Sequence, residues 1–179
     1  AETDIIQRVN YGVGEENETI LSGDIDRTPE DIDGNSVHVV TMNYLSDKTE
    51  LNGFTITAGN ANMKHDDIDQ STMTSMEKSI WSDFLRGSRY GGGIININGS
   101  PRIVNCVITG NSTSDFGAGM YNVAQEYSSN VSGIASPTLT NCTITGNYSD
   151  GSWSQGGGLF NSAGRNSVAN PTLIFCTIT

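Results

Sequence analysis

One short segment of sequence occurs three times, and its spacing constrains the fold more than any other feature of the chain. In each copy a Pro is followed five residues later by Cys-x-Ile-Thr, and the copies occupy 100–111, 136–147 and 170–179. We call this segment the cysteine motif. Its cysteines, at positions 106, 142 and 176, are 36 and 34 residues apart. Repeats of this period stack on one another, because a single copy cannot bury its own apolar side.

A second motif reads Gly-x-Gly, two large apolar residues and Asn, and it occupies 91–96, 117–122 and 156–161. We call it the glycine motif. A weaker copy of the cysteine motif lies at 50–60, where Phe54 takes the place of the cysteine. The glycine motifs are unevenly spaced, so we place the extra residues in loops. The motifs themselves read as short strands, because they are rich in β-branched residues and bounded by Gly, Asn and Pro.

Alternation within the motifs separates an inward face from an outward face. In the second cysteine motif, Cys142 and Ile144 share one side and the threonines share the other. Strands this short pair with the same strand one repeat along, in parallel, which predicts a parallel β-solenoid. Stacking then predicts three columns: Phe54, Cys106, Cys142 and Cys176; Ile56, Ile108, Ile144 and Ile178; and, at a turn, Asn96, Asn122 and Asn161, each amide bonding the next repeat.

Composition and charge agree with stacked repeats and exclude two classes of partner. Hydrophobic residues are 35% of the chain and aromatic residues 7%, which is enough when each repeat covers its neighbour. The formal charge of −11 excludes a general nucleic-acid binder, because neutralising phosphates requires clustered Lys and Arg. No apolar run reaches the roughly 18 residues of a membrane span, so we expect no span in this segment.

Residues 61–90 interrupt the repeats, and we interpret them as an insertion with one short helix. Thr74 to Glu77 read as a capping box, and Gly87 as a C-cap. Apolar residues at helical spacing follow the capping box, so the helix is predicted near 74–86. They are Met76, Ile80, Trp81, Phe84 and Leu85. Two roles remain open for this helix, which are covering the side or end of the solenoid and docking a partner.

The motifs resemble the repeats of right-handed parallel β-helix surface proteins in the pectin-lyase-like superfamily. The similarity is closest to polymorphic outer-membrane-protein-type repeats, which pair a Gly-Gly-Ala-Ile word with a Phe-x-x-Asn word. The chain has Gly-Gly-Gly-Ile at 91–94 and carries Ile in place of that Phe at 108–111 and 144–147. Residues 18–60 also resemble the start of large secreted bacterial β-helix proteins. The resemblance implies an all-β, right-handed parallel β-helix at the cell surface or secreted, with adhesive, envelope or carbohydrate-related roles.

The ends of the sequence favour an excerpt over a whole protein. It starts without Met and stops within a strand-like apolar run. We therefore expect residues 1–179 to be a single β-helix segment of a longer chain, with 61–90 as its insertion.

The superfamily also contains lyases and hydrolases of acidic polysaccharides, which need clustered carboxylates and, for lyases, a basic residue on the outward strand faces. In this chain those faces carry Thr, Ser, Asn and Val. Arg102 is the one basic residue in a repeat strand, and we expect no strand Asp or Glu beside it. We therefore assign no catalytic residue. Aromatic residues near loops remain candidates for a sugar-binding groove: Tyr90, Tyr121, Tyr127, Tyr148 and Trp153.

An acidic loop near the N-terminal side is a candidate metal site, and residues 65–69 form another acidic cluster. The loop places oxygen-bearing side chains at alternate positions, as calcium loops do. These residues are Asp24, Asp26, Asp31, Asp33 and Asn35. The pattern is not an EF-hand, because Met42 stands where the final Glu is required. Two interpretations stay open, a solvated acidic loop and a bound calcium ion.

Outward threonines also align between repeats, at Thr57, Thr109, Thr145 and Thr179. A flat threonine array can bind ice, but Val107 interrupts the set. We prefer the interpretation that these are ordinary strand-forming threonines.

The sequence therefore favours a non-enzymatic extracellular or cell-surface structural or adhesive β-helix protein. Open solenoid ends favour self-association into filaments or layers. The alternative is a polysaccharide-active or carbohydrate-binding β-helix.

Overall fold

A computed structural model of the chain describes residues 18–28, 31–62, 89–126, 131–152 and 154–179. These residues form short strands and contain no helix. The helix predicted near 74–86, with most of the 61–90 insertion, lies outside the described residues. The strands are β1 (Ile20–Ser22), β2 (Val40–Asn43), β3 (Glu50–Asn52), β4 (Thr55–Thr57), β5 (Asn60–Ala61), β6 (Ile94–Ile97), β7 (Arg102–Val104), β8 (Val107–Thr109), β9 (Ser112–Thr113), β10 (Met120–Ala124), β11 (Ile134–Ala135), β12 (Thr138–Thr140), β13 (Thr143–Thr145), β14 (Tyr148–Ser149), β15 (Leu159–Ala163), β16 (Val168–Ala169), β17 (Thr172–Ile174) and β18 (Thr177–Ile178).

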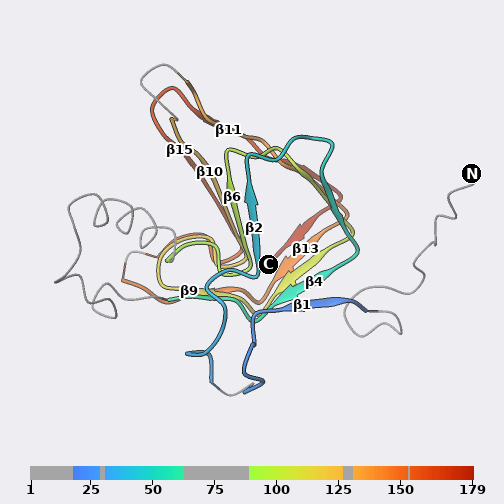
Figure 1. Ribbon diagram of the computed structural model, residues 1–179, viewed down its shortest axis with the longest axis vertical. Helices are drawn as coiled ribbons and strands as arrows, with labels where there is room; N and C mark the ends of the chain where they lie inside the picture. The colour runs from blue at the N-terminus through green and yellow to red at the C-terminus, as the bar shows by residue number, and fades with distance from the viewer. Residues whose placement is uncertain (1–17, 29–30, 63–88, 127–130, 153) are drawn as a thin grey trace, which may run out of the picture.

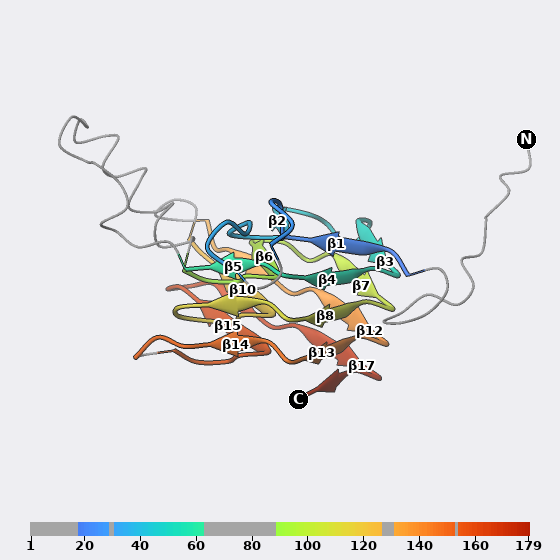
Figure 2. The same ribbon diagram turned by 90° about the horizontal axis from the view of Figure 1, so that it is seen from below.

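The strands form five sheets. Sheet A has the order β1-β4-β8-β13-β18, sheet B β15-β10-β6-β2, sheet C β17-β12-β7-β3, sheet D β14-β9-β5 and sheet E β11-β16. From β3 onward the chain runs through sheets C, A, D and B in that order and then returns to sheet C, passing through sheet E on its two later returns. Figure 1 shows corresponding strands of successive repeats lying over one another, and Figure 2 shows them as stacked layers.

All strand pairs are parallel, and the register confirms the predicted alignment of the cysteine motifs. In sheet A, Ile56 pairs with Ile108, Ile108 with Ile144, and Ile144 with Ile178. In sheet C, Leu139 pairs with Ile103 on one side and Leu173 on the other. Parallel pairing of one repeat with the next therefore organises both sheets.

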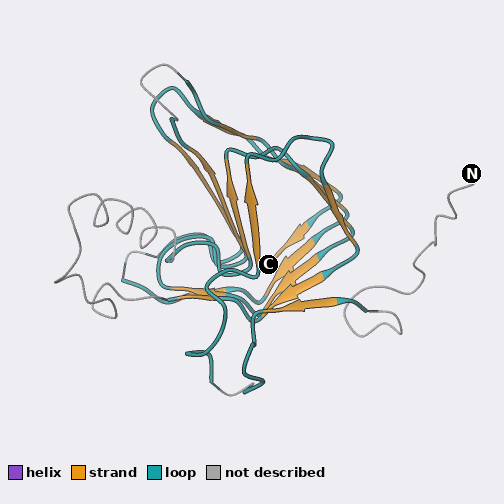
Figure 3. Ribbon diagram, viewed as in Figure 1, coloured by secondary structure: helices purple, strands orange, loops and turns teal. Residues whose placement is uncertain are grey.

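The core is built where the inward faces of sheets A, B and C meet. One cluster of buried residues takes members from all three sheets: Ile56, Ile108 and Ile144 from sheet A; Met42, Ile94 and Met120 from sheet B; Ile103 and Leu139 from sheet C; and Cys106 and Cys142 between sheets C and A. Figure 3 shows the strands of these sheets around the centre of the view, with loops extending outward. A single layer of strands surrounds this core, so side chains of medium size, mostly Ile, Leu, Met and Cys, fill it.

The backbone explains why the first and third positions of the glycine motif are Gly. Gly117, the first Gly of its motif, has φ +63°, a conformation that residues with a Cβ rarely adopt. The third Gly is required by close approach, since a Cβ on Gly119 would lie 2.4 Å from the Gly158 carbonyl oxygen in the next repeat. The motif therefore specifies a turn and then a tight contact between repeats.

The turn from sheet C to sheet A also uses left-handed backbone in each repeat. Gly53, Asn105, Asn141 and Phe175 occupy this position, with φ between 52° and 74°. Gly and Asn tolerate this conformation well, whereas a bulky side chain is strained in it. The Asn141 Nδ2 donates to Asn105 Oδ1 at 2.8 Å, so the amides also link neighbouring repeats. Asn141 thus lies in a turn and bonds the preceding repeat.

Two parts of the architecture were not predicted from the motifs. Sheets D and E were not anticipated, because all their strands are only two residues long and carry no alternating pattern. The column of Asn96, Asn122 and Asn161 exists, but it lies within strands β6, β10 and β15 and not at a turn. An inward Asn is favourable in a strand here because the next repeat supplies its hydrogen-bond partner.

Candidate functional site

The buried polar side chains of the described chain hold repeats together. Asn96 Nδ2 donates to Asn122 Oδ1 at 2.6 Å, and Asn122 Nδ2 donates to Asn161 Oδ1 at 3.0 Å. The same two amide groups also donate to main-chain carbonyls of Gly99 and Ala135. Asn96 and Asn122 are fully buried. The Nδ2 groups of Asn96 and Asn122 therefore have partners within the protein, and neither buried side chain is accessible to a ligand.

A second amide column follows the cysteine motifs, and the sequence reasoning missed it. Asn111 Nδ2 donates to Asn147 Oδ1 at 2.9 Å and to the Ile56 carbonyl at 3.0 Å. Asn111 Oδ1 accepts from the Gly59 main-chain N–H at 3.0 Å. The repeated Thr-Gly-Asn ending of the motif was the signal for this column.

The column of Asn96, Asn122 and Asn161 ends at β2 with one unmatched atom. Met42 takes the position of the asparagine in β2, where it pairs in register with Asn96. The buried Asn96 Oδ1 consequently has no hydrogen-bond partner among the described residues. The first strand of sheet B therefore breaks the polar column with an apolar side chain.

The acidic loop between β1 and β2 extends away from the sheets (Figure 1). Asp24 Oδ1 accepts from the Thr28 main-chain N–H at 3.0 Å, and Asp26 Oδ1 accepts from the Thr28 hydroxyl at 2.7 Å. This hydroxyl bond holds the pKa of the Asp26 carboxyl below its ordinary value. Asp31 Oδ1 accepts from the Asp33 main-chain N–H at 2.9 Å. These bonds stabilise turns within the loop.

The same loop does not gather its carboxylates into a metal-holding group. In the part of the chain that the structure describes, no group of three or more His, Cys, Asp or Glu is arranged to hold a metal ion. Asp26, Asp31 and Asp33 are exposed. The Asn35 Oδ1 is buried with no hydrogen-bond partner among the described residues, and its backbone N–H donates to the Ile32 carbonyl. Calcium binding by the loop stays a prediction.

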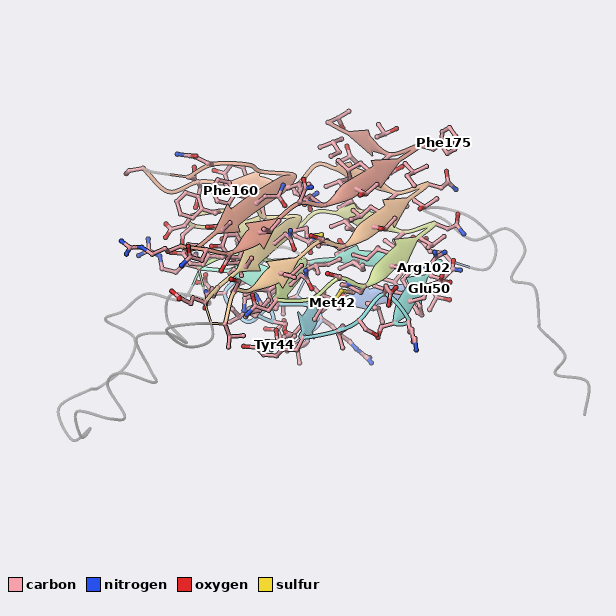
Figure 4. All side chains as sticks on the ribbon, turned by 90° about the horizontal axis from the view of Figure 1, so that it is seen from above. Met42, Tyr44, Glu50, Arg102, Phe160 and Phe175 are labelled. Carbon is pink, nitrogen blue, oxygen red and sulfur yellow. The ribbon has the colours of Figure 1, made fainter. Side chains whose placement is uncertain are left out.

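Arg102 has a strand carboxylate beside it, so the expectation that none accompanies it is wrong. Glu50 in β3 pairs in register with Arg102 in β7, and the Nε–Oε2 distance is 2.9 Å. Figure 4 shows the two side chains next to each other on the outside of the strands. The hydrogen bond from Arg102 lowers the pKa of Glu50. Glu50 was missed because it differs in type from Arg102, although the two occupy the same position in their motif copies.

The aromatic residues proposed for a sugar groove do not form an open platform. Tyr90 stacks on Tyr121 with ring centroids 4.8 Å apart, and Phe116 and Phe160 complete a four-ring cluster against the outside of sheet B. Tyr121 is buried. Tyr148 lies apart from this cluster and is exposed, while Tyr127 and Trp153 lie outside the described residues. The faces of the stacked rings pack against one another, so these side chains serve as packing residues.

The three cysteines are free thiols that align between repeats. Each Sγ also lies 3.4–3.6 Å from a main-chain carbonyl oxygen of the neighbouring repeat, for Cys142 that of Ile103. The hydrogen bond with Cys106, together with burial, raises the pKa of the Cys142 thiol. Cys106 and Cys142 are buried members of the core cluster and Cys176 packs against it, so this column serves packing.

His38 joins the first repeat to the next. Its Nδ1 lies 3.0 Å from the Gly91 carbonyl oxygen, and burial lowers its pKa below the ordinary value. The ring is therefore neutral near neutral pH and acts as a donor to that carbonyl.

Comparisons with known proteins found no relative of the chain. No family model matches the chain, and neither a curated protein nor a solved structure matches it. Within the described ranges, no helix is long and apolar enough to cross a membrane. Function is therefore inferred from the described side chains and from the resemblance in the repeat motifs.

Proposed function

We propose that the chain is a right-handed parallel β-helix segment that acts as a non-enzymatic structural or adhesive scaffold, secreted or at the cell surface. The observation that carries this proposal is the regular return of the chain to the same sheets. Sheets A to C each add one strand per repeat, always in parallel, as winding around one axis requires. The resemblance of the motifs to β-helix surface repeats supports the handedness and the location.

The use of polar groups also supports a scaffold. Asn96, Asn111 and Asn122 are fully or almost fully buried, and their amides bond the next repeat. Each added repeat thus satisfies the amides of the previous one. Such a design favours a long, rigid object whose outer surface can vary freely.

For residues 1–179 as an isolated segment, the same design favours self-association. The edge strands β17 and β18 leave Leu173 and Ile178 partly exposed, at 44% and 43%. Unpaired strand edges that carry apolar side chains are templates for pairing with another chain. We expect the purified chain to form large particles by light scattering. Ile178→Lys should reduce their size, while Thr138→Lys on the outside of sheet C should not; a wild-type chain that stays monomeric at high concentration contradicts self-association.

The alternative function is carbohydrate recognition or cleavage, and Glu50 with Arg102 is the observation that favours it. An outward Arg beside a carboxylate is part of what a polysaccharide lyase requires. The 2.9 Å ion pair, however, engages both side chains with each other. An assay for unsaturated products from a panel of uronate polymers tests this alternative, with Arg102→Gln as the variant and Arg165→Gln as the control. Product that forms with wild type and the control but not with Arg102→Gln establishes the alternative over the scaffold.

A further inference from the structure

The outward face of sheet A presents two regular columns of side chains. Each strand contributes two outward positions that flank an inward isoleucine or leucine. The first column contains Ser22, Thr57, Thr109, Thr145 and Thr179. The second column contains Ile20, Thr55, Val107, Thr143 and Thr177. In Figure 2, β1, β4, β8 and β13 of this sheet lie one beneath the next as near-parallel arrows.

The register makes this array periodic in two directions. Neighbouring strands of a sheet lie about 4.8 Å apart, and outward residues of one strand lie about 6.7 Å apart. At the last two positions of the first column the hydroxyl groups bond each other, with Thr179 Oγ1 donating to Thr145 Oγ1 at 2.7 Å. Threonine is stiff at χ1, so its hydroxyl and methyl groups keep their places when the surface meets a ligand.

The array is also uncharged from β8 onward, whereas the Glu18 carboxylate accepts a hydrogen bond from Thr55 in β4. Neither column contains Asp, Glu, Lys or Arg, although the chain carries a formal charge of −11. Thr57, Thr109, Thr143 and Thr145 are partly exposed, and Thr177 and Thr179 are exposed. Thr55 does not belong to the contact surface, because it is 4% exposed and bonds Glu18. An uncharged periodic surface is complementary to an uncharged periodic solid.

We propose that the outward face of sheet A binds the surface of ice crystals. Hexagonal ice exposes water oxygens in a net whose repeats are close to the two spacings of this array. Each hydroxyl contributes little alone, but the sheet holds the whole set in place before binding, so little conformational entropy is lost. Val107 keeps the methyl shape of Thr within the second column and lacks only the hydroxyl. Ser22 continues the hydroxyl column by one strand beyond the threonines.

The test uses the full chain in dilute buffer with a single ice crystal as the probe. Wild type is expected to show thermal hysteresis and to inhibit ice recrystallisation. Thr109→Lys is expected to abolish both effects, because a long charged side chain lifts the ice away from the columns. Thr138→Lys makes the same change on the outside of sheet C and is expected to retain wild-type activity. Circular dichroism and urea unfolding verify that both variants fold.

A second variant tests the array without risk to the fold. Val107→Thr restores a hydroxyl in the second column and is expected to increase the hysteresis severalfold. The proposal is overturned if wild type neither arrests nor reshapes ice crystals at millimolar concentration. It is equally overturned if folded Thr109→Lys is as active as wild type, or if Thr138→Lys loses as much activity as Thr109→Lys.

Discussion

The second and third cysteine motifs have nearly the same sequence, but their side chains differ in burial. Ile144 and Leu139 are fully buried, whereas Ile178 and Leu173, their register partners in the third motif, are 43% and 44% exposed. The inward orientation is the same in both motifs. The difference is that β12 and β13 have a neighbouring strand on both sides, and β17 and β18 have one on a single side. Burial in this molecule is thus supplied by the adjacent repeats.

The free energy that each position contributes to stability therefore depends on the neighbouring repeats. The apolar side chains that a repeat carries gain their stabilising free energy only where another repeat removes them from water. Identical substitutions in the second and third motifs should therefore have different effects.

The largest effect is expected for apolar truncation in a repeat with neighbours on both sides. Ile108→Ala should lower the free energy of unfolding by about 2–5 kcal/mol, because it leaves a cavity between Ile56 and Ile144. Ile178→Ala, in the last strand of sheet A, should cost about 1 kcal/mol, since that side chain is already partly in water. Urea unfolding of both variants measures the difference. Equal losses would show that burial does not depend on the adjacent repeat.

The next effect concerns the amide column of sheet B. Asn122→Ala should lower the free energy of unfolding by about 1–3 kcal/mol, because it leaves the buried Asn96 amide without one of its acceptors. Asn161→Ala should cost less, since Asn161 is exposed and accepts only from Asn122 in this column. Urea unfolding again gives both values. A larger loss for Asn161 would contradict the role of the column in joining repeats.

The residues that could be predicted from sequence are those whose partner has the same identity in the next repeat. Ile56, Ile108, Ile144 and Ile178 align by inspection, and the structure confirms their register. Contacts between unlike residues could not be found in that way. Glu50 and Arg102 occupy the same position of the 50–60 and 100–111 motif copies and face each other because β3 and β7 pair, but they differ in type, so matching identical residues did not reveal the contact.

The same reasoning explains the other differences between expectation and structure. All strands of sheets D and E have two residues, too short for alternation to be visible. Whether the four aspartates of the loop converge depends on turns that Thr28 and main-chain groups stabilise, and spacing along the chain does not specify those turns. Repetition thus predicts the stacked sheets well and predicts the loops between them poorly.

A smaller effect, in the stabilising direction, is expected at the sheet C to sheet A turn. Phe175 has φ 52° and is 89% exposed, where the two preceding repeats have Asn. Phe175→Asn should raise the free energy of unfolding by about 1 kcal/mol, because Asn tolerates left-handed backbone and can bond Asn141. The reciprocal change, Asn141→Phe, should destabilise by more, as it also removes the bond to Asn105. Thermal unfolding compares the two, and destabilisation by Phe175→Asn would contradict the prediction.

The smallest effect is expected at the first repeat, where His38 contacts Gly91. Burial lowers the pKa of His38 below its ordinary value of 6.5, so the folded state binds its proton less well than the unfolded state. The resulting stability is present above pH 6.5 and is lost as pH falls through the lower folded pKa. His38→Gln should remove this part of the pH dependence, because an amide can donate to the same carbonyl without titrating. His65→Gln provides the matched control among the two histidines, and unfolding measured between pH 7 and pH 5 should be affected by the first substitution alone. If the free energy of unfolding of wild type did not change between pH 7 and pH 5, the first repeat would not depend on this neutral contact with its neighbour.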